Sequence, residues 1–480
     1  MLTSSSAIFW LLLFSAGFAI SGVMYSRHER SSLEDYVVAR NSQSTLATII
    51  TLLATSLGAW ILFAPAQAAT WGGLAAIIGY GLGAASPRWL MIPLGRRMRE
   101  LIPQGHTLTE FVILRYGKVM YSLVLIIVMF YMFITLTAEI TAISKLVQLL
   151  APVPLGWTAA IVMIFTLLYT SYGGLRASIF TDKVQIVIIL PLLFVLMVLG
   201  WQATGGILPV MEQLHSKAPQ LLNLSDPVGI KAGLTFFVAI LLTGLFHQGN
   251  WQRVYSAKDT GSMKRGFLLG GLFAGPFIFI MGLFGLAFVA MGHTGDSSVA
   301  LFSVLQGHIP GWFAIALIPL GLSLVMSSAD TCINAVSSLI AVDMRRLTPN
   351  LSKPALMNLS RWLIYLLAIP VIIVAAQGYN VLYLFLLADL FCSAAAFPVF
   401  FGLFNRRYNG VLACVSTVCG LAAGISLFPG PGEKPVYLLE AFLLAALVPA
   451  VVSWLLLRLT NGQKHFDFDS LNPAIRNLDE

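Results

Sequence analysis

Long apolar runs recur along almost the whole of this 480-residue chain, and they constrain its fold more than any other feature. A run of roughly 18 or more apolar residues is long enough to cross a bilayer as a helix. The composition agrees, because 58% hydrophobic and only 10% charged residues are too apolar for a soluble globule of this size. About thirteen transmembrane helices are therefore predicted, at 7–25, 44–66, 70–94, 119–149, 154–172, 182–203, 231–251, 266–292, 311–343, 359–377, 380–404, 409–428 and 436–459.

The basic residues predict the orientation of these spans. When successive loops are assigned alternately to two sides, most of the 28 lysines and arginines fall on the side that holds the loop after the first span. Basic loops remain on the cytoplasmic side, so we expect the N-terminus outside and the C-terminus inside a multi-pass protein of the plasma or inner membrane. Charges scattered over several loops also argue against a nucleic-acid partner.

Several classes of function are disfavoured by what the sequence lacks. No GxxxxGK[ST] phosphate loop is present, so ATP-driven pumping is not supported. The four cysteines lie in apolar segments, which supports neither a disulfide framework nor a zinc site. No nucleophile elbow or metal cluster suggests an enzyme, and no obligate protein partner is evident.

The stretch Met326-Ser327-Ser328-Ala329-Asp330-Thr331 places three hydroxyls and a carboxylate inside an apolar run. Polar groups at that depth usually face a cavity, a partner or a bound ion. Hydroxyls within about one helical turn suit a hard cation that takes oxygen ligands. The alternative is that these hydroxyls bond back to their own helix and pack against a neighbour.

Four segments together resemble the sodium/solute symporter family, whose members carry proline, pantothenate, sugars, sialic acid or urea. Two are early in the chain: one begins Asp35-Tyr36 and ends Arg40-Asn41, and the other runs from Tyr169 to Gln185 and contains Thr181-Asp182. The other two are Asn250-Trp251-Gln252-Arg253 with the residues up to Lys258, and the Ser327-Ser328-Ala329-Asp330 stretch. All four occur in the family's order and spacing.

The resemblance implies an all-α core of two inverted five-helix repeats, at 44–203 and 231–404. An extra helix at 7–25 precedes the core, and two helices at 409–459 and a tail at 460–480 follow it. The implied function is sodium-coupled symport of a small polar organic solute such as an amino acid, urea, a sugar or a carboxylate. A proton-coupled symporter of the same fold and a transporter-like solute sensor remain as alternatives.

The resemblance also implies two ion sites, with sodium as the coupling ion. Its principal site would use the backbone carbonyls of Ala54, Leu57 and Leu324 and the hydroxyls of Ser327 and Ser328. A second site would combine Asp182 with Ser327, Asp330 and Thr331. Since Asp330 stands where some relatives have hydroxyls, this second site differs in charge or serves protons. The alternative for Asp182 is a helix N-cap.

The second and seventh spans are the expected broken helices, and binding sites in such folds lie beside the breaks. Candidate solute-binding residues there and on the fourth and eleventh spans are Ser56, Trp60, Phe63, Glu139, His247, Gln248, Asn250 and Asp389. The carboxylates of Glu139 and Asp389 can hold a cationic group, accept a proton or pair across the bundle. Glu139 has the alternative of reaching headgroup water, and His247 that of a structural hydrogen bond.

Overall fold

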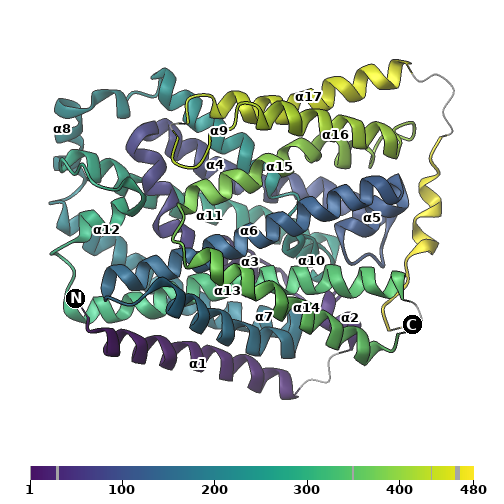
Figure 1. Ribbon diagram of the computed structural model, residues 1–480, viewed down its shortest axis with the longest axis horizontal. Coiled ribbons are helices and arrows are strands. Elements are labelled where there is room, and N and C mark those ends of the chain that lie inside the picture. The colour runs from purple at the N-terminus through teal and green to yellow at the C-terminus, as the bar shows by residue number, and fades with distance from the viewer. Residues whose placement is uncertain (1, 29–31, 349–350, 434, 460–464, 480) are drawn as a thin grey trace.

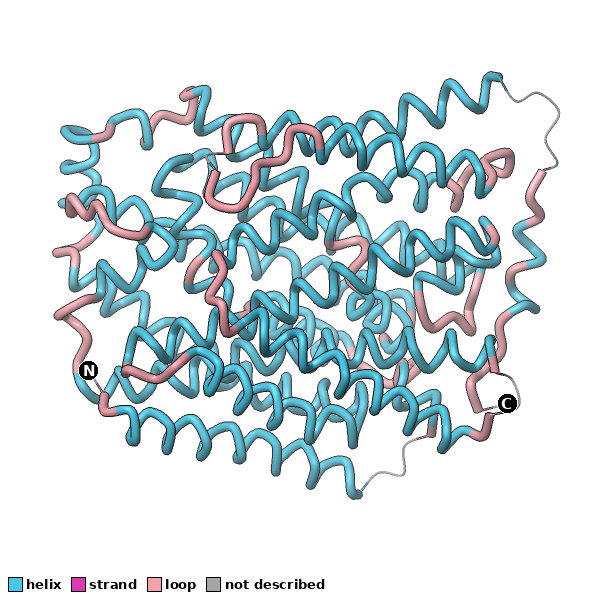
Figure 2. Tube along the Cα trace, in the orientation of Figure 1, coloured by secondary structure: helices cyan, strands magenta, loops and turns pink. Residues whose placement is uncertain are grey.

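The computed structural model describes residues 2–28, 32–348, 351–433, 435–459 and 465–479. Residues 460–464 and 480 of the predicted tail therefore lie outside the described residues. Figure 1 shows a bundle whose long helices run roughly along one axis, with the two chain termini at opposite ends. Helices and loops make up the trace in Figure 2, as expected of an all-α membrane protein.

The α-helices are α1 (Ser4–His28), α2 (Leu33–Val37), α3 (Thr45–Ser56), α4 (Ala64–Leu101), α5 (Leu108–Tyr116), α6 (Lys118–Leu150), α7 (Leu155–Ala203), α8 (Ile207–Lys217), α9 (Pro227–Thr243), α10 (Gln248–Ser256), α11 (Thr260–Ala290), α12 (Ala300–Leu305), α13 (Gly311–Leu347), α14 (Lys353–Ala375), α15 (Val381–Phe401), α16 (Gly410–Ile425) and α17 (Leu438–Leu459). The short 3-10 helices are η1 (Ala59–Leu62), η2 (Pro219–Leu221), η3 (Ser297–Val299), η4 (Phe468–Ser470) and η5 (Asn472–Ala474).

Fewer continuous spans are found than the thirteen predicted. Within the described part of the chain, nine helices are long and apolar enough to cross a membrane, or ten if the bent pair α9 and α10 forms one span. The axes of that pair differ by 56°, and α3 and α16 are apolar but shorter. The number of crossings and their orientation stay predictions.

A single glycine accounts for one difference from the predicted spans. The sequence predicts separate spans at 154–172 and 182–203, whereas α7 continues through both, with non-helical backbone at Gly174. The φ of Gly174 is 56°, in the left-handed region that side chains disfavour. A Cβ there would lie 2.4 Å from Cδ2 of Tyr36. The chain therefore changes direction at one residue rather than over a loop of several.

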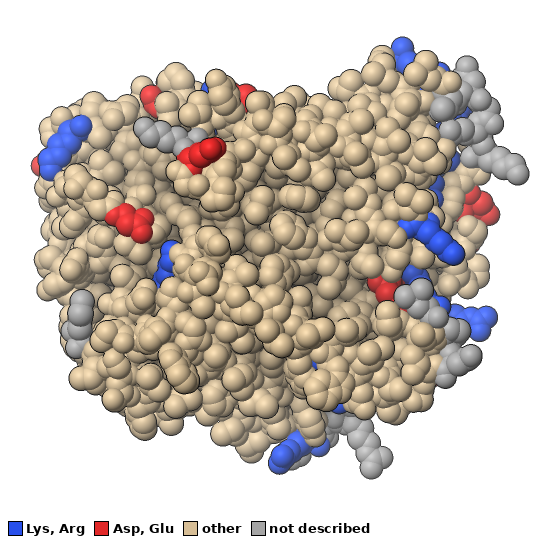
Figure 3. Space-filling view, viewed as in Figure 1, with Lys and Arg blue, Asp and Glu red and all other residues tan. Residues whose placement is uncertain are grey.

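The packing places α3 and α13 at the centre of the bundle. α13 contacts α6 and α7 along its length, and α3 lies between α7 and α11. The middle of α13 is completely enclosed, including the hydroxyl of Ser327 and the carboxylate of Asp330. In Figure 3 most of the basic side chains in view lie toward the end that carries the C-terminus, and the broad face between the two ends is nearly free of charge.

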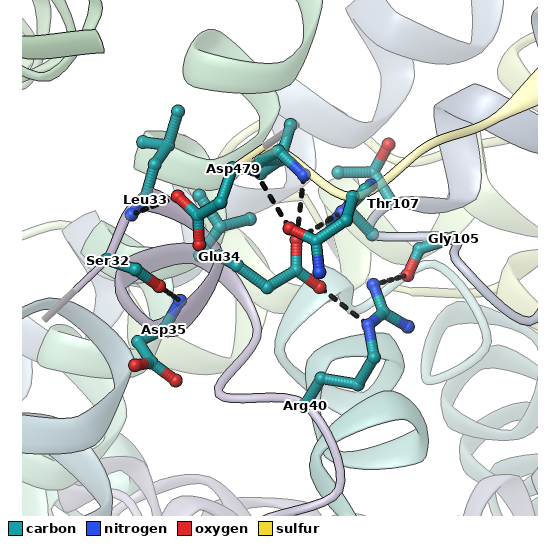
Figure 4. Close-up of polar contacts among 12 residues, drawn as sticks. Ser32, Leu33, Glu34, Asp35, Arg40, Gly105, Thr107 and Asp479 are labelled. Atoms are coloured by element: carbon teal, nitrogen blue, oxygen red, sulfur yellow. Dashed lines mark hydrogen bonds and ion pairs between the residues drawn. The ribbon is translucent and has the colours of Figure 1, made fainter.

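A polar network ties the loops together at that C-terminal end (Figure 4). The carboxylate of Glu34 accepts hydrogen bonds from Nε of Arg40 at 2.6 Å and from the backbone N–H of Leu478 at 3.1 Å. Its other partner is Nε2 of His106 at 2.8 Å, and Nδ1 of His106 lies 3.2 Å from Glu110. One imidazole thus joins two carboxylates from different segments.

We expect this imidazole to make the stability of the protein depend on pH. Burial lowers the pKa of His106, but the charge of Glu110 and the hydrogen bonds with both carboxylates outweigh burial and raise it from 6.5 to about 9. Because the folded pKa is the higher one, this contribution is complete below about pH 6.5 and is lost as the pH rises through about 9. The Tm of the detergent-solubilised protein should fall across that interval.

His106→Gln should remove most of that pH-dependent part of the Tm. The exposed His308 provides a matched control, because His308→Gln should leave the dependence in place. An unchanged slope in the His106 variant would contradict the assignment.

Candidate functional site

The site is built around an interruption in the polypeptide between α3 and η1. α3 ends at Ser56, and Leu57 leaves helical geometry with a ψ of 66°. Gly58 is extended, and Ala59 then begins the short turn η1. An interrupted helix leaves carbonyls and N–H groups without their usual partners, and inside a membrane protein other groups must satisfy them.

Hydroxyls from α13 reach the carbonyls at the end of α3. The Oγ of Ser327 donates to the carbonyl of Ala54 at 3.0 Å and lies 3.1 Å from that of Leu324. The Oγ of Ser328 lies 3.3 Å from the same Leu324 carbonyl. Both hydroxyls bond back to their own helix, as the alternative for these serines expects, and Ser327 in addition contacts Ala54 on another helix. Four of the five oxygens predicted for sodium are thereby gathered, and Leu57 follows Ala54 at the interruption.

These oxygens are neutral, and a neutral oxygen cluster of this kind suits a hard monovalent cation. Among the described residues, no three His, Cys, Asp or Glu side chains are placed to hold a metal ion together.

A second polar cluster surrounds Asp330, one turn further along α13. Its carboxylate accepts hydrogen bonds from Ser178 at 2.7 Å, Tyr169 at 2.8 Å and Thr181 at 3.1 Å. These three donors lie on α7, so the carboxylate fixes α13 against that helix.

Asp182 and Thr331 meet at the guanidinium of Arg253. The NH2 group of Arg253 lies 3.3 Å from Oδ2 of Asp182 and 3.0 Å from Oγ1 of Thr331. Asp182 lies inside α7, eight residues beyond Gly174, so the N-cap interpretation was wrong. In the sequence Arg253 stands out only as part of a motif, and the ion pair with Asp182 was not predicted. The Oδ1 atom of Asp182 is buried and has no hydrogen-bond partner in the described part of the chain.

A cavity of about 130 Å³ lies beside the interruption. Six of the eight predicted solute-binding residues line it, namely Ser56, Trp60, Glu139, His247, Asn250 and Asp389. The other two lie elsewhere. Phe63 packs its ring 5.2 Å from that of Phe302, and the Gln248 amide binds the carbonyl of His106 at 2.9 Å.

Several further side chains line the cavity that the sequence analysis did not select as binding residues: Tyr80, Arg88, Tyr131, Thr135 and Phe385. Two features of the sequence could have identified three of these residues. Arg88 is an arginine within a predicted span, and such charges usually have a function. Tyr131 and Thr135 precede Glu139 at intervals of four residues, which puts all three on one face of α6.

Glu139 satisfies a backbone N–H group that the interruption leaves without a helical partner. Its Oε2 accepts a hydrogen bond from the backbone N–H of Ala59 at 2.7 Å, and the side chain is buried. The alternative that Glu139 reaches headgroup water was therefore wrong. A Cβ on Gly58 would lie 1.8 Å from Oε1 of Glu139, so any other residue at this position would have to displace the carboxylate.

Asp389 also faces the cavity, but its carboxylate is held differently. Its carboxylate is hydrogen-bonded to the side chain of Thr243, and its backbone carbonyl accepts a hydrogen bond from Ser393 at 2.8 Å. None of the ion pairs between described residues includes Asp389. The exposed fraction of the residue is 6%, so it is nearly enclosed.

The comparisons with known proteins include a family model that covers more than half of the chain. A family model described as "Sodium:solute symporter family" matches residues 36–420. Spermidine transporter DUR31 of Candida albicans is 25% identical, over 87% of this chain and 79% of its own. The sodium/pantothenate symporter of Escherichia coli is also 25% identical, over 55% of this chain and 56% of its own.

Solved structures share the fold. A structure of a Na+-coupled sialic acid symporter in a substrate-bound, outward-open state superposes with a TM-score of 0.75 at 16% identity, covering 96% of this chain and 99% of that one. The nucleobase-cation-symport-1 transporter Mhp1 gives a TM-score of 0.59 at 13% identity, covering 92% and 98%.

Gly58→Ala tests how the interruption is held. The added methyl group would displace the Glu139 carboxylate and leave the N–H of Ala59 unsatisfied, which costs about 1–3 kcal/mol. We expect the Tm of the purified protein to fall by several degrees. Gly17→Ala on α1 is the matched control, because nothing lies within 4 Å of a Cβ there. Equal Tm values for the two variants would show that the contact is unimportant.

Proposed function

The chain belongs to the sodium:solute symporter family, whose members are multi-pass integral membrane transporters rather than enzymes, and on that premise we propose that it imports a small polar organic solute together with sodium. The relatives carry different solutes by name, including spermidine, glucose and pantothenate, at about 25% identity. The candidate solutes therefore remain amino acids, urea, sugars and carboxylates. The N-terminus is proposed to lie outside and the C-terminus inside.

One observation carries the proposal: Ser328 belongs both to the oxygen cluster and to the cavity wall. Sodium bound by Ala54, Leu57, Leu324, Ser327 and Ser328 would join α3 to α13. The same interruption in α3 positions Ser56 and Trp60 for the solute. Occupying one site would therefore shape the other, which is what coupled transport requires.

Alternating access supplies the transport step. We assign the moving parts to the two repeats, 44–203 and 231–404, which would rock against each other around the midplane site. Since α3 belongs to the first repeat and α13 to the second, sodium would hold the repeats together. Release of the ion would then free them to separate.

The second ion site is proposed at Asp182, Asp330, Thr331 and Ser327. Two carboxylates and the single guanidinium of Arg253 leave one negative charge if both carboxylates are ionised, and a second sodium or a proton would balance it. The unpartnered Oδ1 of Asp182 supports a ligand role for this residue.

Uptake into proteoliposomes tests the function directly. An imposed inward sodium gradient should drive accumulation of a solute from a panel of amino acids, amines, sugars, urea and carboxylates. Uptake driven by a pH gradient with sodium rigorously absent would favour the proton-coupled alternative. Saturable sodium-dependent binding without any accumulation would favour the sensor.

Ser328→Ala should raise the sodium concentration needed for half-maximal uptake roughly tenfold, because it removes one of about five ligands and tenfold corresponds to about 1.4 kcal/mol. Uptake at saturating sodium should largely survive. Ser323→Ala is the matched control, because that buried hydroxyl on the same helix has no hydrogen-bond partner among the described residues. Normal uptake by the Ser328 variant at limiting sodium would show that the site is misplaced.

Asp182→Asn tests the second site. If Asp182 binds a second sodium, the sodium Hill coefficient should fall toward one while the principal site still binds. Asp259→Asn is the matched control, because Asp259 caps α11 at the surface and Asn caps about as well as Asp. Unchanged cooperativity in the Asp182 variant would rule out a second sodium at this position.

A further inference from the structure

Three ionisable side chains of the cavity, Arg88, Glu139 and Asp389, differ in their hydrogen-bond partners. Arg88 donates from NH1 to the carbonyl of Ala84 and from NH2 to the Oγ of Ser56. Glu139 accepts the N–H of Ala59. None of the ion pairs between described residues includes Asp389, Glu139 or Arg88, so the cavity wall carries two carboxylates and one guanidinium, and an added cation would balance them if all three are charged.

A carboxylate that is nearly enclosed and unpaired needs a counter-charge, a proton or water. The phenols of Tyr80 and Tyr131 lie close enough to Asp389 to interact with its charge, but neither is a cation. The side chain of Thr243 is hydrogen-bonded to the carboxylate, but a hydroxyl brings no positive charge, so a cationic solute in the cavity would supply the missing counter-charge.

Aromatic rings lie around the same carboxylate. Phe385 precedes Asp389 by one turn of α15, and its ring lies edge-on to that of Trp60, with centroids 6.0 Å apart. Trp60 in turn stacks on Tyr80 at 5.6 Å. Ring faces attract ammonium groups, and the attraction is stronger where water is excluded. A carboxylate beside such rings favours an organic cation over a neutral solute.

We propose that the transported solute is a small organic monocation whose ammonium group lies between Asp389 and the rings of Trp60 and Phe385. This inference rests on the proposed function, since it assigns the solute of the same cavity. It also uses Asp389 in a role that a purely structural hydrogen bond would not explain.

Arg88 helps to position Ser56. Its NH1 and NH2 groups each donate one N–H, to the carbonyl of Ala84 and to the Oγ of Ser56. The second N–H of each terminal nitrogen and the buried Nε are not used in these bonds. A cation and a zwitterion must therefore be compared by experiment.

The volume of the cavity limits the size of the proposed cation. In an engineered cavity of about 150 Å³ in another protein, benzene fits. The cavity beside Asp389 is about 130 Å³, so it matches a compact amine rather than a long polyamine or a disaccharide.

The test compares solutes that differ only in charge, on the wild-type protein in saturating sodium. The cations are 2-aminoethanol and its trimethylated form, choline. Their neutral isosteres are propan-1-ol and 3,3-dimethylbutan-1-ol, and glycine betaine represents zwitterions. At least one cation should raise the Tm and accumulate in proteoliposomes, with apparent affinity at least tenfold higher than its isostere and the zwitterion. Equal effects of a cation and its isostere would overturn the proposal.

Asp389→Asn keeps the shape of the side chain and removes its charge. The variant should lose at least tenfold in affinity for the cation while sodium alone still raises its Tm. Asp296→Asn is the control, because Asp296 caps η3 away from the cavity and Asn caps equally well. Unchanged cation affinity in folded Asp389→Asn would also overturn the proposal, and the wild-type isostere comparison decides the matter if this variant does not fold.

The outcomes separate this inference from the function on which it rests. Sodium-driven uptake of a sugar, urea or a carboxylate, with no cation transported, would leave symport intact and refute the cation assignment. No sodium-driven uptake of any solute in the full panel would refute symport itself.

Discussion

The interruption between α3 and η1 imposes the requirement on which the rest of the site depends. Backbone groups freed inside a membrane protein must find partners, because lipid provides none. Here the Ala54 carbonyl accepts hydrogen bonds from Ser327 and from the N–H of Leu57, and the Ala59 N–H donates to Glu139. Ser327 and Glu139 come from α13 and α6, so both helices are tied to the break by hydrogen bonds. The break therefore organises the centre of the bundle.

The need to satisfy the backbone groups at the break also indicates what bound sodium would replace. Ser327 satisfies Ala54 by donating a hydrogen bond, and sodium would satisfy the same carbonyl by coordination. When sodium coordination replaces the hydrogen bond from Ser327, the Ala54 carbonyl keeps a partner. The oxygen cluster can therefore exist with or without the ion. Because Ser328 also faces the cavity, that exchange would be transmitted directly to the solute.

The sequence predicted the family and the all-α class because long apolar runs and four ordered motifs are local signals. It could not predict that Gly174 alone turns the chain, since the requirement there is a contact with Tyr36 from another segment. Nor could adjacency along the chain show that Phe63 and Gln248 point away from the cavity that Trp60 and Asn250 line. Partners such as Arg253 for Asp182 are distant in sequence, and no spacing rule identifies them.

The buried charges differ in how they are compensated, and that difference separates scaffold from site. At the C-terminal end, Glu34 lies against His106 and Arg40, so its charge is matched whatever else is bound. Asp182 has Arg253, and Asp330 has three hydroxyl donors. Asp389 lies in the cavity wall near aromatic rings, and none of the ion pairs between described residues includes it. A permanently paired charge holds a structure together in every state of a transport cycle. A charge whose partner must arrive from outside can instead distinguish the loaded state from the empty one.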